Sequence, residues 1–126
     1  MEVHRGLGPG LLESAYEAAF CDELVTRKID FVRQQEMPVK YKGRLIDCGY
    51  RLDVVAENRV IIELKAVEKT LPIHEAQLLT YLKLSNLQLG LIINFNVRLL
   101  RNGIQRIANN LCVSSSAISA VSAVQT

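Results

Sequence analysis

The residues of this chain best suited to chemistry are two acids and a lysine near its middle. Nine residues separate Asp53 from the triplet Glu63-Leu64-Lys65. Residues 60–67 are otherwise apolar and rich in β-branched types, as in a buried strand, where Glu63 and Lys65 point to the same face. Charged side chains are seldom buried unless they are paired or bind an ion. The pattern therefore suggests a metal site with a catalytic cation beside it.

The simpler interpretation is a buried ion pair between Glu63 and Lys65, or a strand with one wet face. An acid, nine residues, and then Glu-x-Lys is a short and degenerate pattern, so by itself it would favour that interpretation. Other motifs along the chain favour the metal site. Binding of Mg²⁺ or Mn²⁺ would separate the two, because an ion-pair network has no site for either ion.

Two further motifs lie on stretches that we expect to be helical. Gly10, Glu13 and Tyr16 form G-x-x-E-x-x-Y, and Gln77 and Tyr81 form Q-x-x-x-Y. Spacings of three and four residues place the functional members of each motif on one helix face. Structural explanations also exist. Glu13 could be an acid favoured at the start of a helix, Tyr16 a core aromatic, and Gln77 an interior amide with satisfied hydrogen bonds.

Taken in order, these motifs resemble the GxxExxY family, a branch of the PD-(D/E)xK nuclease superfamily. The Q-x-x-x-Y element is similar to that of RecB-type nucleases. The resemblance covers residues 3–107, and it implies a single-domain α/β protein with a restriction-endonuclease-like core. It also implies a metal-dependent phosphodiesterase that acts on nucleic acid, with DNA as the expected substrate. A homodimer is left open.

The resemblance implies a role for each motif residue. Asp53, Glu63 and the backbone carbonyl of Leu64 would hold Mg²⁺ or Mn²⁺, and Lys65 would orient water or stabilise phosphate charge. The remaining motif residues would line the site: Glu13, Gln77 and Tyr81. Leu52 stands where the superfamily name has proline. The alternatives are a catalytically silent nuclease-like protein that binds nucleic acid or a protein partner, and a structural domain whose acids form ion pairs.

Hydrophobic periodicity and turn residues predict the order α-β-β-β-α-β in one domain, residues 1–110, with a mixed sheet between helices. We expect a tight turn at Glu57-Asn58-Arg59, which would bring Asp53 back toward Glu63. The predicted elements are a helix at 11–28, strands at 31–41, 44–56 and 60–67, a helix at 72–84, a strand at 88–95 and a short strand-like piece within 97–107.

The two ends of the chain carry separate expectations. Residues 1–10 are expected to end in a flexible turn, Gly6-Leu7-Gly8-Pro9-Gly10. Relatives usually have a helix ahead of this turn, so a late start would leave core surface uncovered. Residues 111–126 hold no charged side chain and are expected to be a loosely held extension. Deleting residues 113–126 should leave stability and activity nearly unchanged.

Composition sets the class of protein. The chain has 126 residues, 15 Lys and Arg against 13 Asp and Glu, and three scattered cysteines without a C-x-x-C pair. One core, a reducing compartment and a cytoplasmic location follow as expectations, with no signal peptide or membrane span. The near-balanced charge neither shows nor excludes nucleic-acid binding. Five basic residues before the acids could line a phosphate track or a solvated edge: Arg33, Lys40, Lys42, Arg44 and Arg51.

Overall fold

A computed structural model describes residues 2–47 and 50–109 of the chain. The elements are α1 (Glu2–Leu7), α2 (Glu13–Thr26), β1 (Phe31–Glu36), β2 (Val39–Tyr41), β3 (Arg44–Ile46), β4 (Arg51–Ala56), β5 (Val60–Lys65), α3 (Pro72–Ser85), β6 (Leu89–Asn94), the 3₁₀ helix η1 (Leu100–Asn102) and β7 (Ile104–Ala108). None of the described helices is long and apolar enough to cross a membrane.

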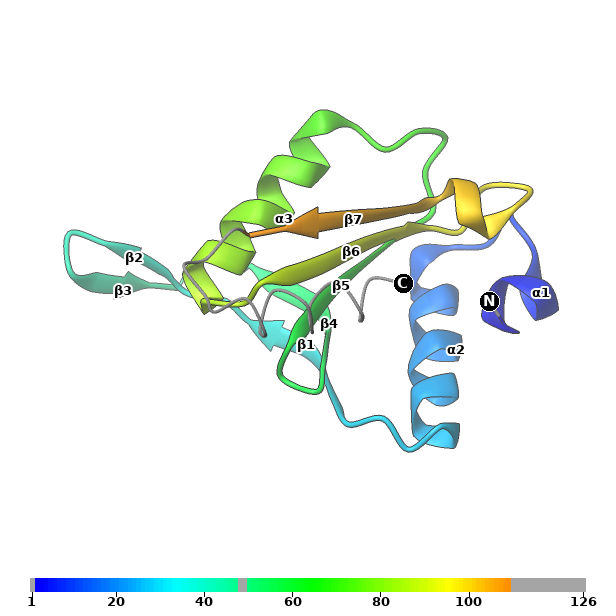
Figure 1. Cartoon of the computed structure of the whole chain (residues 1–126), viewed down its shortest axis with the longest axis horizontal. Coiled ribbons are helices and arrows are strands. Elements are labelled where there is room, and N and C mark those ends of the chain that lie inside the picture. The colour runs from blue at the N-terminus through cyan, green and yellow to red at the C-terminus, as the bar shows by residue number, and fades with distance from the viewer. Residues whose placement is uncertain (1, 48–49, 110–126) are drawn as a thin grey trace, which may run out of the picture.

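Five of the strands form one mixed sheet in the order β1-β4-β5-β6-β7 (Figure 1). The pair β5 and β6 is parallel, and the other neighbours are antiparallel. The parallel pair needs a crossover, which α3 supplies between the two strands. The predicted α/β class with a mixed sheet flanked by helices is therefore confirmed.

Each face of the sheet has its own core. On one face, α2 packs Tyr16, Cys21 and Leu24 against a cluster that includes Val54, Ile62, Leu64 and Phe95. On the other face, α3 packs Leu78 and Leu82 against a cluster that includes Leu52, Val55, Ile61 and Ile92. Tyr16, Leu78 and Leu82 are fully buried, so both helices are fixed in rotation about their axes.

The structure corrects the prediction of two long strands before the Glu57-Asn58-Arg59 turn. The stretch 31–41 is divided into β1 and β2, because Pro38 has no N–H to donate to a ladder. The stretch 44–56 is likewise divided into β3 and β4. Strands β2 and β3 pair only with each other and form a separate two-stranded sheet, which projects from the body in Figure 1.

The sequence does not predict a helix ahead of the turn that precedes α2, but a short helix, α1, lies there. Val3 is buried in the core on the α2 face, and His4 Nε2 lies 2.7 Å from the Val97 carbonyl oxygen. The hydroxyl of Tyr16 donates a hydrogen bond to the Gly8 carbonyl and accepts one from the Leu11 N–H. These contacts hold the turn against α2.

The predicted piece within 97–107 consists of η1 followed by β7, which pairs antiparallel with β6. The predicted extension, residues 111–126, lies outside the described residues. The expected effect of deleting residues 113–126 therefore stays a prediction.

Candidate active site

The candidate site lies where β4 and β5 stop pairing. Their antiparallel register ends at Val54 and Ile62, one residue before Asp53 and Glu63 would face each other. Beyond this point the backbone N–H of Leu64 donates a hydrogen bond of 2.8 Å to Asp53 Oδ2. The carboxylate of Asp53 therefore takes over from the ladder as the link between the two strands.

Glu63 is the most unusual group of the site, because its side chain is buried in the sheet. Only 9% of the residue is exposed, and its Oε1 has no hydrogen-bond partner among the described residues. The pKa of Glu63 is raised to about 8, first by burial and then by the charge of Asp53, while the charge of Lys65 acts in the opposite direction. Lys65 does not offset the other two effects, so a further positive charge would stabilise the carboxylate.

Lys65 follows Glu63 on the same face of β5 and is half-buried. Its charge lowers the pKa of Glu63, so the two groups are within electrostatic range of each other. Its backbone carbonyl accepts a hydrogen bond of 2.9 Å from the Phe95 N–H, toward β6. Because neighbouring residues of a strand direct their backbone groups to opposite sides, the carbonyl of Leu64 points toward β4 and Asp53.

The end of β5 is fixed by a buried amide on β6. Asn94, which is 3% exposed, accepts a hydrogen bond of 3.1 Å from the Val67 N–H and donates one of 2.9 Å to the Val67 carbonyl. Both backbone groups of Val67 are therefore held by one side chain. This clamp limits the movement of the strand end that carries Lys65.

Two residues that sequence reasoning missed adjoin the acids. Gln34 Nε2 donates hydrogen bonds to Glu17 Oε1 at 2.5 Å and to Asp53 Oδ1 at 3.5 Å. Gln34 has a φ of 53°, in the left-handed region, and the register of β1 with β4 skips it. Asp53 is skipped in the same register, so the ladder is interrupted here, and the Gln34 side chain joins a carboxylate on α2 to the site on β4.

Glu17 is positioned from a second side by Arg33, whose Nη2 lies 3.0 Å from Glu17 Oε2. The Glu17 side chain is 12% exposed, against 44% for Arg33. Glu17 lies one helical turn after Glu13, which is the signal in the sequence that could have identified it.

Cys21 lies one further turn along α2 and faces the same surroundings. Burial raises the pKa of its thiol, Arg33 lowers it, and the charges of Glu17 and Asp53 raise it. A raised pKa keeps the sulfur protonated near neutral pH, which does not suit a nucleophile. Cys21 therefore acts as an apolar wall of the site.

The two residues of the first motif are placed differently. Glu13 is exposed at the start of α2, at the rim rather than among the acids that Gln34 joins. Tyr16 is completely buried, and its ring stacks on Phe95 at a centroid distance of 4.5 Å. Together with its hydroxyl contacts to the turn, this makes Tyr16 a structural residue, as its simpler explanation predicted.

Gln77 and Tyr81, the residues of the second motif, lie on one side of α3, which we call its β4 shoulder. The opposite shoulder faces β7, where Gln105 Nε2 donates a 2.8 Å hydrogen bond to Glu75 Oε1. The ring of Tyr81 lies 5.8 Å from that of Tyr50, just before β4, so this shoulder faces the β4 side. Gln77 is exposed one turn earlier on the same shoulder. Gln77 therefore lies on the side of α3 that faces β4, and its side chain is exposed to solvent.

The donor set fits a hard divalent cation. Within residues 2–47 and 50–109, no three His, Cys, Asp or Glu side chains gather into a ready cage. Magnesium keeps several waters and is commonly held by one or two carboxylates, so a full cage is not required. Asp53, Glu63 and the Leu64 carbonyl provide oxygen donors only. The partnerless Oε1 of Glu63 is the atom that a cation would satisfy.

One comparison with known proteins gave a match. A family model described as "PD-(D/E)XK nuclease superfamily" matches residues 1–107, which include all the elements described above except the last residue of β7. Searches of the curated proteins and of the solved structures gave no match.

Proposed function

Because the chain belongs to the PD-(D/E)XK nuclease superfamily, we propose that it is a divalent-metal-dependent nuclease that hydrolyses phosphodiester bonds in DNA. The observation that carries this proposal is the buried Glu63 carboxyl, with an unpartnered oxygen, beside both Asp53 and Lys65. A purely structural ion pair would leave no such atom, because its lysine would satisfy it.

Asp53, Glu63 and the Leu64 carbonyl would hold Mg²⁺ or Mn²⁺. When bound, such an ion neutralises phosphate charge and lowers the pKa of water. Asp53 is kept in place by the Leu64 N–H and by Gln34, so its oxygens need little rearrangement. Lys65 is close enough to the acids to orient the attacking water or to bind a phosphate oxygen as negative charge develops.

The groups around the acids complete the proposed site. Glu17 places a third carboxylate behind Gln34, where it can orient water on the α2 side. Gln77 and Tyr81 would approach the substrate from α3, and Glu13 would do so from the rim of α2. These three assignments, and membership of the GxxExxY branch, rest on the motifs in the sequence.

The test is cleavage by purified protein of linear duplex, circular duplex, single-stranded DNA and RNA, each with Mg²⁺, Mn²⁺ or EDTA. We expect cleavage of DNA with either ion and none with EDTA. Metal binding should also be measured by calorimetry, without substrate, in the parent and in Glu63→Gln. Tight binding of DNA without any cut would instead indicate a silent relative of the nucleases.

The role of Gln77 has a separate test. Gln77→Ala should lower the cleavage rate about tenfold or more, as for a lost positioning contact, and leave the melting temperature unchanged because the side chain is exposed. Thr80→Ala is the control, since Thr80 is an exposed neighbour on α3. An unchanged cleavage rate in Gln77→Ala would remove Gln77 from the site.

A further inference from the structure

The two-stranded sheet of β2 and β3, which we call the arm, has no structural partner among residues 2–47 and 50–109 that explains its surface. It projects from the end of the main sheet in Figure 1. Its large apolar side chains are exposed: Tyr41 by 56%, Leu45 by 72% and Ile46 by 44%. A short exposed hairpin is marginally stable by itself, so its retention in the fold needs another explanation.

The charge of the arm has a single sign. Residues 37–46 include Lys40, Lys42 and Arg44 and no acid. Two other basic residues of this region are neutralised, because Arg33 pairs with Glu17 and Arg51 pairs with Glu36 at 3.2 Å. The positive charge of the region is therefore concentrated on the arm.

The pairing of the arm distributes these cations. Tyr41 is opposite Arg44, and Lys40 is opposite Leu45, so each face of the ribbon carries one cation. Lys42 occupies the tip with a φ of 49°, and its Nζ lies 5.4 Å from the centre of the Tyr41 ring. The arm thus presents positive charge on both faces and at its end.

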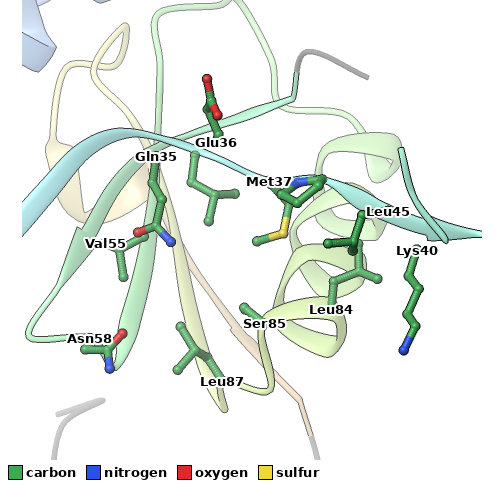
Figure 2. Close-up of a pocket in the computed structure, with 12 residues that line it drawn as sticks. Gln35, Glu36, Met37, Lys40, Leu45, Val55, Asn58, Leu84, Ser85 and Leu87 are labelled. Carbon is green, nitrogen blue, oxygen red and sulfur yellow. The ribbon is translucent and has the colours of Figure 1, made fainter. Parts of the chain in front are cut away.

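The arm is attached to the body only at its base. There Met37, which is 7% exposed, donates its backbone N–H to the Tyr50 carbonyl at 2.9 Å. A pocket of about 400 Å³ lies beside this base, and its lining includes Lys40 and Leu45 of the arm and Leu84 of the last turn of α3 (Figure 2). The arm is therefore free on its other face and at its tip.

The base of the arm is next to the proposed site. Strand β4 begins at Arg51, and Asp53 is its third residue. At about 3.3 Å per residue, the nine residues from Asp53 back to Arg44 span at most about 30 Å. That length corresponds to about nine steps along a nucleic-acid strand, at 3.4 Å each.

We propose that the arm binds the phosphate backbone of duplex DNA to one side of the cleaved bond. A two-stranded ribbon has the width that a major groove admits, and the cations on its free face and at its tip would then meet the phosphates that border the groove. A single strand is instead bound along a groove with several stacking aromatics, whereas the arm carries one tyrosine and projects freely. The inference rests on the proposed nuclease function for its substrate.

The experiment measures binding alone, in EDTA, to a duplex of about 20 base pairs and to one of its separated strands, over a range of salt concentrations. The arm variant is Lys42→Gln with Arg44→Gln, and the control is Lys28→Gln with Arg59→Gln. Each pair removes one lysine from a left-handed position, with φ of 49° and 57° respectively, and one exposed arginine. Both controls lie at the opposite end of the sheet from the arm, near the turn that joins β4 to β5 and the end of α2.

We expect the arm variant to bind duplex at least tenfold more weakly near 0.1 M salt, with a salt dependence reduced by about two counterions. The control should match the parent. Equal losses in both variants, an unchanged salt dependence, or a loss confined to single-stranded DNA would overturn the inference. Cleavage by the parent in Mg²⁺ is measured separately. A nuclease whose arm does not bind DNA is therefore distinguishable from a protein without nuclease activity.

Discussion

The backbone N–H of Leu64 is bonded to the side chain of Asp53, at 2.8 Å from Oδ2, at the point where strands β4 and β5 cease to pair. This contact holds one oxygen of the acid and at the same time fixes the backbone of the Glu63-Leu64-Lys65 segment. Structure and proposed chemistry therefore depend on the same carboxylate.

Asp53→Asn and Asp53→Ala should both abolish cleavage but differ in stability. The Asn side chain retains an acceptor for the Leu64 N–H, whereas Ala leaves this donor unpaired at a cost of about 1–2 kcal/mol. Asn also removes the negative charge that raises the pKa of Glu63. In metal-free buffer at pH 8, Asp53→Asn should therefore be at least as stable as the parent.

Urea unfolding of the two variants, with exposed Asp22→Asn as control, measures these differences. Cleavage by Asp53→Asn at the parent rate would exclude Asp53 from the reaction. Equal stability of the Asn and Ala variants would show that the Leu64 hydrogen bond contributes nothing.

The pH dependence of folding should report Glu63 in metal-free buffer. Its pKa is about 8 in the folded protein, against 4.5 as its ordinary value. Between these values the folded state holds a proton that the unfolded state has lost, so the free energy of unfolding falls as pH rises. The stabilisation is complete below pH 4.5, and a few kcal/mol are lost by pH 8.

Glu63→Gln cannot titrate, so it should remove this slope and be more stable than the parent at pH 8. Denaturant unfolding at pH 5, 6, 7 and 8 gives the comparison. Exposed Glu68→Gln is the control and should retain the parent slope. If the parent and Glu63→Gln lose stability in parallel, Glu63 is ionised in the folded protein throughout this range.

Lys65→Met should retain metal binding and lose most of the turnover. The ammonium repels a cation, so its removal does not weaken the ligand set directly, but it removes a group that stabilises developing phosphate charge. A fall in kcat of about 100-fold is expected. Because Lys65 lowers the pKa of Glu63, the variant should also need a higher pH to bind Mg²⁺.

Calorimetric titration with Mg²⁺ across pH, together with single-turnover cleavage, measures both effects for Lys65→Met. Lys69→Met, on an exposed loop position, is the control. Turnover at the parent rate would reduce Lys65 to an ion-pair partner.

The central part of the site could be predicted from sequence because it depends on local structure. The Glu57-Asn58-Arg59 turn has left-handed φ values at Glu57 and Asn58, and the hairpin it closes brings Asp53 toward Glu63. Pro72 likewise begins α3 as predicted. These features involve neighbours in the sequence or a two-residue period, which the residue types reveal.

The outer part of the site depends on long-range geometry that residue types do not reveal. Gln34 has a left-handed φ where the pairing of β1 with β4 is interrupted, and nothing in its residue type predicts that conformation. Similarly, the rotation of α2 is set by burial of Tyr16, Cys21 and Leu24, and that rotation turns Glu17 inward and leaves Glu13 exposed. The motif identified this helix face, and Glu17, one turn further along it, is the acid that contacts Gln34.

The last prediction compares these two acids directly. Glu17→Gln should lower the cleavage rate about tenfold, which corresponds to about 1.4 kcal/mol in the barrier, because the carboxylate behind Gln34 loses its charge while the amide keeps an acceptor for it. Glu13→Gln should have a smaller effect, since that side chain is exposed at the rim. Initial rates at saturating Mg²⁺, with melting temperatures to show that both variants fold, measure the difference. A larger loss in Glu13→Gln would mean that substrate or metal draws Glu13 into the site, and that Glu17 serves only to hold Arg33 and Gln34 in place.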